Sequence, residues 1–154
     1  MENKPLKRLE FSINYLLNKT VLYCKIASLQ AFKQNNFDIT PEQFGVLYIL
    51  SHEDGLYQRQ LSQLTLKDRP NISRILNILE ENEYIYRKPD PENKRIMKVF
   101  ITEKGRTQVE AMLPCAYEVR NKAIKGLTEN DLENLARILQ IVRSNLEESF
   151  KLQI

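Results

Sequence analysis

Three side chains that hydrogen-bond well to nucleobases lie close together in this 154-residue chain. Ser73, Arg74 and Asn77 are spaced so that a helix would present them on one face. Arginine can form a bidentate pair with guanine, asparagine can do the same with adenine, and serine can contact a base or a phosphate. The pattern indicates a surface that reads base edges in the major groove of DNA, although an ordinary amphipathic surface helix would also produce it.

The segment that contains these three residues is rich in basic side chains. Residues 67–106 contain ten basic and seven acidic residues, and a polar loop at 89–95 ends in Lys94 and Arg95. A protruding turn that carries an arginine can reach the strong negative potential of a narrow minor groove, while a charged hairpin tip without a partner is the alternative. The candidate DNA-binding residues are Lys67, Arg69, Pro70, Asn71, Ser73, Arg74, Asn77, Lys94 and Arg95.

The chain offers little catalytic chemistry. Its single histidine, His52, precedes two acidic residues at a predicted helix end, where we expect a surface or capping role. The four glycines are too far apart to form a phosphate-binding loop, and Glu80 and Glu81 are predicted to be solvated at an exposed helix end. We therefore expect no enzymatic activity, no cofactor and no metal site.

A helix over residues 68–82 must carry the base-reading face. Asp68 is a good N-cap, and Pro70 is tolerated in a first turn. Four apolar residues recur at the spacing of one buried face, namely Ile72, Ile75, Leu76 and Leu79. A short helix over 57–64 and a turn at 65–67 precede this helix, so the pattern predicts two helices joined by a tight turn.

A β-hairpin is predicted to follow. The β-rich runs 84–88 and 96–101 enclose the polar loop 89–95, and they are the only strong strand signal in the chain. With four glycines and six prolines, the sequence has too little turn chemistry for an all-β fold. We expect helices elsewhere.

The first predicted helix, over residues 6–35, is apolar on too wide a face for one neighbour. One stripe comprises Leu6, Leu9, Ile13, Leu16, Thr20, Tyr23 and Ala27, and a second comprises Leu17, Val21, Cys24 and Leu29. The next helix should begin at a capping box, with Thr40 as N-cap, Pro41 at the first position and Gln43 at the third, and should end near Gly55.

Two further helices complete the chain. Thr102 is predicted to cap a long helix with Pro114 as a kink and Gly126 near its end. Its expected inward face comprises Val109, Leu113, Ala116, Ala123 and Leu127. Thr128 and Asp131 form a capping box for the last helix, whose apolar stripe comprises Leu132, Leu135, Ile138, Leu139, Ile141, Val142 and Leu146.

Composition bounds the class of protein. The apolar share of 42% and charged share of 28% are ordinary for a soluble single domain, and no apolar run is long enough to span a bilayer. Residues 1–7 lack the apolar core of a secretory signal, so we expect a cytoplasmic protein. The net charge of +3 is too modest by itself to prove an anionic partner.

The stretch 68–80, followed by 84–87, 90–95 and 99–106, resembles the MarR family of bacterial winged-helix regulators. The resemblance implies a mainly α fold with a small β-hairpin wing. It implies a winged helix-turn-helix core over 37–101, flanked by dimerisation helices over 1–36 and 102–154 that intertwine in a homodimer on a pseudo-palindromic operator. It also implies that Arg95 is the wing-tip arginine and that Asn71, Ser73 and Arg74 lie on the recognition helix.

Three residues depart from the family pattern. Asn93 replaces an aspartate two positions before the wing arginine, so a weaker amide contact or none is expected there. Glu83 replaces the glycine that ends the recognition helix, at a cost of about 1 kcal/mol unless Asn82 takes the left-handed conformation. Tyr57 replaces the Ser or Thr that caps the preceding helix.

The function implied is that of a homodimeric, sequence-specific regulator of transcription, a repressor that responds to a small effector. Seven tyrosines could line a pocket for an aromatic or phenolic effector, or could simply pack in the core. One alternative is a winged-helix module that binds protein and does not read DNA. Another is a redox-sensing regulator that uses Cys24 or Cys115, although Cys24 lies on an apolar stripe and Cys115 has no basic neighbour nearby.

Overall fold

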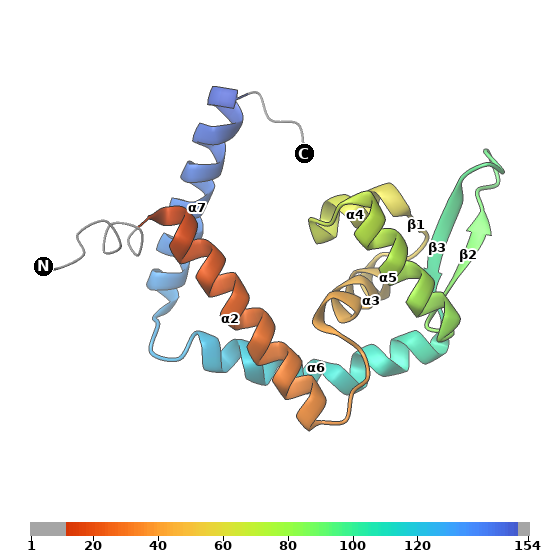
Figure 1. The fold of residues 1–154 in the computed structure, drawn as a ribbon, viewed down its shortest axis with the longest axis horizontal. Helices are drawn as coiled ribbons and strands as arrows, with labels where there is room; N and C mark the ends of the chain where they lie inside the picture. The colour runs from red at the N-terminus through yellow and green to blue at the C-terminus, as the bar shows by residue number, and fades with distance from the viewer. Residues whose placement is uncertain (1–11, 151–154) are drawn as a thin grey trace, which may run out of the picture. The chain divides into compact units, whose positions relative to one another are not determined.

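The computed structural model describes residues 12–150, which form six α-helices and a three-stranded antiparallel sheet (Figure 1). The helices are α2 (Ile13–Gln34), α3 (Pro41–His52), α4 (Gln58–Thr65), α5 (Arg69–Glu81), α6 (Glu103–Ala123) and α7 (Glu129–Phe150). The strands are β1 (Leu56–Tyr57), β2 (Ile85–Pro89) and β3 (Met97–Ile101). The expected fold class, mainly α with a small hairpin wing, is confirmed.

The chain forms two compact units, residues 1–119 and 120–154. The core of the first unit draws on α3, α4, α5, the sheet and the first part of α6. Its fully buried side chains include Val46, Leu47, Leu50, Leu61, Ile72, Leu76 and Met112. Burial of this many branched apolar side chains is the main stabilising contribution to the unit.

Local capping explains where the helices begin. Thr40 Oγ1 accepts the N–H of Gln43, and the Gln43 side chain accepts the N–H of Thr40, which is the predicted capping box of α3. Asp68 caps α5 by accepting the N–H of Asn71 at 2.8 Å, and Thr128 caps α7 through Asp131. These side chains satisfy N–H groups that the helices cannot pair internally.

The sheet has the order β1-β3-β2, so β3 is central. In the predicted hairpin, β2 pairs with β3 from Ile85 opposite Ile101 to Pro89 opposite Met97. The sequence prediction missed β1, where Leu56 pairs with Val99 and Tyr57 with Lys98. A strand of two residues has no alternation to detect. The prediction that a helix starts at Tyr57 was therefore wrong by one residue, since Tyr57 belongs to β1.

The joint between α5 and β2 is a left-handed turn at Glu83. Glu83 has φ +60°, whereas Asn82 has φ −90°, so the glutamate and not Asn82 takes the left-handed conformation. The carbonyl of Glu83 accepts a hydrogen bond from Thr102 Oγ1 at 2.7 Å, which ties the turn to the start of α6. This contact helps to offset the conformational cost of the left-handed residue.

The helix α6 packs against the end of the hairpin at a glycine. A Cβ atom on Gly105 would lie 2.3 Å from the carbonyl oxygen of Tyr84, so only glycine allows this approach. The buried residues of α6 are Gly105, Val109, Met112 and Cys115. Ala123 and Leu127, expected on the same inward face, are exposed, because the first unit ends before them.

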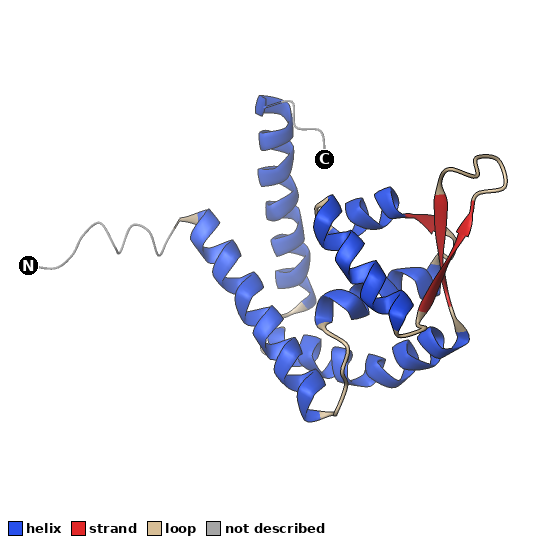
Figure 2. Cartoon of the chain, turned by 45° about the vertical axis from the view of Figure 1, so that its right-hand side comes forward, coloured by secondary structure: helices blue, strands red, loops and turns tan. Residues whose placement is uncertain are grey.

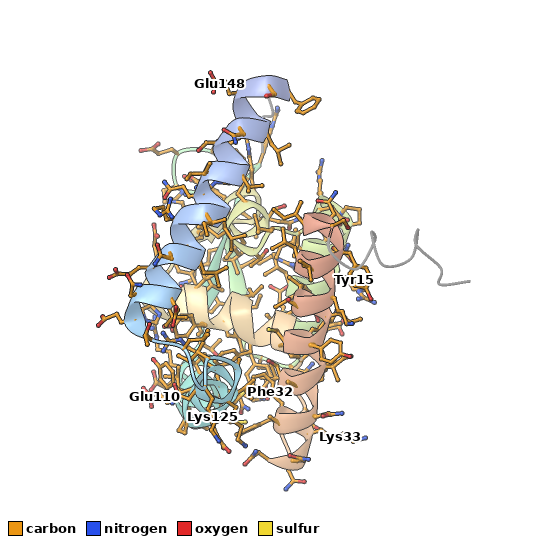
Figure 3. All side chains as sticks on the ribbon, turned by 90° about the vertical axis from the view of Figure 1, so that its left-hand side faces the viewer. Tyr15, Phe32, Lys33, Glu110, Lys125 and Glu148 are labelled. Carbon is orange, nitrogen blue, oxygen red and sulfur yellow. The ribbon has the colours of Figure 1, made fainter. Side chains whose placement is uncertain are left out.

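Two helices expose long apolar surfaces. Of the described residues of α2, only Phe32 is buried, and its neighbour Lys33 points outward (Figure 3). Leu6 and Leu9, predicted in the same stripe, lie outside the described residues. No described residue of α7 is buried, and the exposed ones include Leu135, Ile138, Leu139, Ile141 and Leu146. Between residues 12 and 150, no helix is both long and apolar enough to cross a membrane.

Candidate nucleic-acid interface

The tight turn between α4 and α5 is closed by its own backbone. Leu66 takes a left-handed conformation with φ +52°, and the N–H of Lys67 donates to the carbonyl of Ser62 at 3.0 Å. The Ser62 hydroxyl in turn donates to the carbonyl of Lys67. The turn therefore joins two helices over three residues, as the helix-turn-helix prediction required.

The helix α5 has one buried face and one exposed face. Ile72, Ile75, Leu76 and Leu79 are all buried, as predicted. On the other side, the side chains of Arg69, Pro70, Asn71, Arg74 and Asn77 are exposed, and Ser73 is half-buried. The predicted helix therefore does bring the candidate reading residues together on one face.

Two of these side chains are held by neighbours. Asn71 Nδ2 donates to Asp68 Oδ2 at 2.9 Å, so its amide lies against the helix cap. Ser73 Oγ donates to the carbonyl of Arg69 at 2.8 Å and accepts from Gln58 Nε2 at 2.6 Å. The hydroxyl proton of Ser73 is used within the helix, and Gln58 was not singled out from the sequence.

Asn77 is held from the wing strand. Arg87 Nη2 donates to Asn77 Oδ1 at 2.9 Å, and Arg87 Nη1 donates to Glu80 Oε2 at 2.5 Å. The guanidinium of β2 therefore clamps two residues of α5. The prediction that Glu80 is solvated was wrong, since this carboxylate is half-buried and paired with Arg87.

The wing, defined as β2, β3 and the loop 90–96, projects beyond the helices of the first unit (Figure 2). Lys94 and Arg95 lie on this loop and are exposed. The loop is partly ordered by Asn93, whose Oδ1 accepts the N–H of Arg95 at 3.2 Å. The Asn93 amide thus contacts the backbone of the residue two positions later, and no ion pair of Arg95 with a described residue accompanies it.

A buried carboxylate anchors the base of the wing loop. Asp90 is 5% exposed; it accepts a hydrogen bond from the Tyr57 hydroxyl and one from the N–H of Glu92 at 2.8 Å, and Lys98 Nζ lies 3.7 Å away. The Tyr57 hydroxyl, chiefly, lowers the pKa of the Asp90 carboxyl, and the same contact raises the pKa of Tyr57. The Tyr57 side chain thus ties β1 to the wing, while its backbone N–H, at the N-cap of α4, donates to Gln60 Oε1 at 2.8 Å.

The candidate basic residues differ in whether their charged groups are already paired within the protein. Arg69, Arg74, Lys94 and Arg95 form no ion pair with any described residue. Lys67 is half-buried, and its Nζ lies 3.8 Å from Glu42, which Lys25 of α2 also contacts at 2.5 Å. The hydrogen bond from Lys25 is the largest cause of the lowered pKa of Glu42.

The single histidine and the two cysteines lie on three different helices, α3, α2 and α6. His52 ends α3 with its Nδ1 2.9 Å from the carbonyl of Tyr48, which confirms a helix-end role. Cys24 is exposed on α2, and Cys115 is buried with its Sγ 3.5 Å from Asn35 Nδ2. Among the described residues, no three metal-ligating side chains cluster. A hollow of about 390 Å³ lies at the C-terminal end of α2 and the segment that connects it to α3, lined by Leu29, Gln30, Phe32, Lys33, Phe37, Asp38, Ile39 and Thr40.

Comparison with known proteins agrees with this architecture. The family model described as "MarR family" matches residues 37–96. The chain is 30% identical to the HTH-type transcriptional repressor NicR of Pseudomonas putida over 118 residues, which is 75% of this chain and 73% of that protein. It is 27% identical to the HTH-type transcriptional regulator YybA of Bacillus subtilis over 124 residues, 80% of this chain and 83% of that protein.

A solved structure shows the same arrangement. The Staphylococcus aureus MepR–DNA complex contains a chain that is 29% identical to this one, with a TM-score of 0.79; the match covers 89% of this chain and 100% of that one. The sequence relatives and the solved structure therefore point to the same group of regulators. The chain belongs to the MarR family of winged helix-turn-helix transcriptional regulators.

Proposed function

We propose that this protein is a sequence-specific DNA-binding regulator of transcription that acts as a homodimer on a pseudo-palindromic operator. The observation that carries the proposal is the exposed face of α5, taken together with the exposed Lys94 and Arg95 on the loop of the wing. Hydrogen-bonding side chains on a helix and an arginine on an adjacent loop suit the major and minor grooves respectively. The MepR structure is a complex with DNA, which supports this partner.

In this proposal the first turns of α5 enter the major groove. Glu80, Glu81 and Glu83 gather at the other end of the helix, where phosphates would repel them. Arg74, Asn77 and Ser73 would contact bases or nearby phosphates, and Pro70 and Asn71 would lie at the groove edge. Arg69, Lys67 and Lys94 would contact phosphates, and Arg95 would enter the minor groove.

The homodimer is proposed from the helices outside the winged core. Val21 and Tyr23 on α2 are 66% and 64% exposed, and α7 buries none of its described residues. An apolar stripe left exposed along a helix of 22 residues is a patch of the kind that marks an interaction surface. We propose that a second copy covers both helices, with 1–36 and 102–154 forming the dimer and 37–101 forming the reading core.

We further propose that the protein is a repressor that works in the cytoplasm, where bacterial DNA lies. The relatives NicR and IacR of Pseudomonas putida are both named as repressors, and each is 30% identical to this chain. A small aromatic or phenolic effector is the proposed signal, since the exposed Tyr23 of α2 could join other tyrosines in a pocket completed by the second copy.

The test is the binding of duplex DNA as a function of salt, together with selection of bound sequences from random DNA. The proposal predicts a palindromic selected site and a log-log salt slope of several units, because each phosphate contact releases counterions. If the protein binds no duplex at low salt, or binds with a slope near zero, the winged core is a protein-binding module. A single, non-repeated half-site would contradict the homodimer.

A further inference from the structure

The amide of Asn77 is held in one orientation by its partner. Arg87 Nη2 lies 2.9 Å from Asn77 Oδ1, and a guanidinium carries only donors. The amide atom that faces Arg87 must therefore be the oxygen, and Nδ2 is turned away from the strand. Asn77 itself is exposed on the same face as Arg74.

Arg87 is itself fixed in place. Its second nitrogen, Nη1, donates to Glu80 Oε2 at 2.5 Å, and its side chain is only 20% exposed. Arg87 also lies within the paired part of β2, opposite Val99. Because the guanidinium is a rigid planar fork, both donors are positioned together, and turning Arg87 away from Asn77 would disturb the ion pair with Glu80.

We infer that Arg87 is a positioning residue that makes Asn77 a hydrogen-bond donor toward DNA, an inference that rests on the proposed operator binding. An asparagine that pairs with adenine must offer both its oxygen and its nitrogen to the base. With Oδ1 held by Arg87, Nδ2 is the atom that reaches the groove, and its two hydrogens match the adjacent acceptors N7 and O6 of guanine. Asn77 therefore selects guanine instead of the adenine that its residue type alone predicts.

Asn71 shows that the hydrogen-bond partner determines which atom of an asparagine amide, the oxygen or the nitrogen, faces away from the protein. Its Nδ2 donates to Asp68 Oδ2, and a carboxylate only accepts, so here the nitrogen faces the protein and the oxygen faces away. The same residue type is thus presented in opposite senses at the two ends of one helix face. Residue type and spacing alone do not contain this information.

The experiment is selection of bound sequences from random DNA with the full chain, for the wild type and for Asn77→Ala. The position that loses discrimination in Asn77→Ala is the one that Asn77 reads. We expect guanine there in the wild type, favoured about tenfold over adenine. In Arg87→Met, which keeps an extended side chain but removes both donors, the preference should move toward adenine at that position alone.

Two variants separate positioning from stability. Glu80→Gln removes the carboxylate but leaves the bond from Arg87 to Asn77, so its base preference should equal that of the wild type. Arg87→Lys retains a donor and should keep guanine even if Arg87→Met does not fold. Adenine at the Asn77 position in the wild type, or the same preference in Arg87→Met, overturns the inference, as does an Asn77→Ala variant with unchanged specificity. Failure of the wild type to select any sequence overturns the proposed function instead.

Discussion

Arg74 is the side chain best placed to test base reading at the scale of single residues. It is exposed on α5 and forms no ion pair with any described residue. We expect Arg74→Ala to weaken binding to the selected operator by roughly 1 to 3 kcal/mol and to relax specificity at one symmetric pair of positions. Titrations against operators changed at single positions measure both effects. Wild-type affinity in a folded Arg74→Ala variant would contradict the reading role.

Arg95 should act through the shape of the minor groove. We expect Arg95→Ala to weaken binding more on an operator with A·T-rich flanks than on one with G·C-rich flanks, because narrow A·T-rich grooves concentrate negative potential. Lys94→Ala is the matched control, since an exposed lysine that contacts a phosphate should lose the same affinity on both operators. Equal losses for both variants would show that Arg95 only contacts phosphate.

The buried Asp90 carboxylate should make the stability of the folded protein depend on pH. Its pKa is lowered in the folded protein, so the stabilisation it provides is present above its unfolded pKa of about 4 and is lost as the pH falls through the folded value. We expect Asp90→Asn to be less stable than the wild type at pH 7 and the difference to shrink below about pH 4. Urea unfolding at pH 7 and at pH 3 measures this. A difference that grows in acid would contradict the assignment.

At the scale of elements, the junction of α6 with the hairpin depends on the absence of a side chain at position 105. Since a Cβ atom there would lie 2.3 Å from the Tyr84 carbonyl oxygen, Gly105→Ala should destabilise the fold by about 1 to 3 kcal/mol. Gly45→Ala is the control, because nothing lies within 4 Å of its Cβ position within α3, and it should stabilise by up to about 1 kcal/mol. Denaturant unfolding compares the two.

The features that were predicted correctly from the sequence are those set by residues close to one another in the chain. Caps such as Thr40 and Asp68 act within three residues, and the buried face of α5 follows from helical spacing. The residues that the sequence analysis missed make contacts between elements that are distant in the sequence. Arg87 meets Asn77 and Glu80 from another element, and Asp90 meets Tyr57 across 33 positions. Such pairings depend on the register of strands and helices in space, which a local pattern does not specify.

At the scale of the whole molecule, the apolar stripe of α7 should determine assembly. Leu135 and Leu139 are 50% and 36% exposed in the single chain. We expect Leu135→Glu with Leu139→Glu to give monomer or aggregate in sedimentation experiments and to abolish operator binding, because the charges cannot be buried against a second copy. Gln140→Glu with Ser144→Glu adds the same charge on the opposite face and should leave a dimer. A folded, monomeric wild type would refute the homodimer.

Glu42 stands between two lysines from different parts of the fold, Lys25 of α2 at 2.5 Å and Lys67 beside α5 at 3.8 Å. In the proposed complex, in which Lys67 contacts a DNA phosphate, the Glu42 carboxylate would compete with that phosphate for Lys67, and its hold on Lys67 would depend on how fully Lys25 neutralises it. Withdrawal of Lys25 would strengthen that competition, while capture of Lys67 by DNA would leave the carboxylate to Lys25 alone. If Lys67 contacts DNA as proposed, operator affinity and the position of α2 would be thermodynamically linked through this one carboxylate, and the linkage would act equally in both directions.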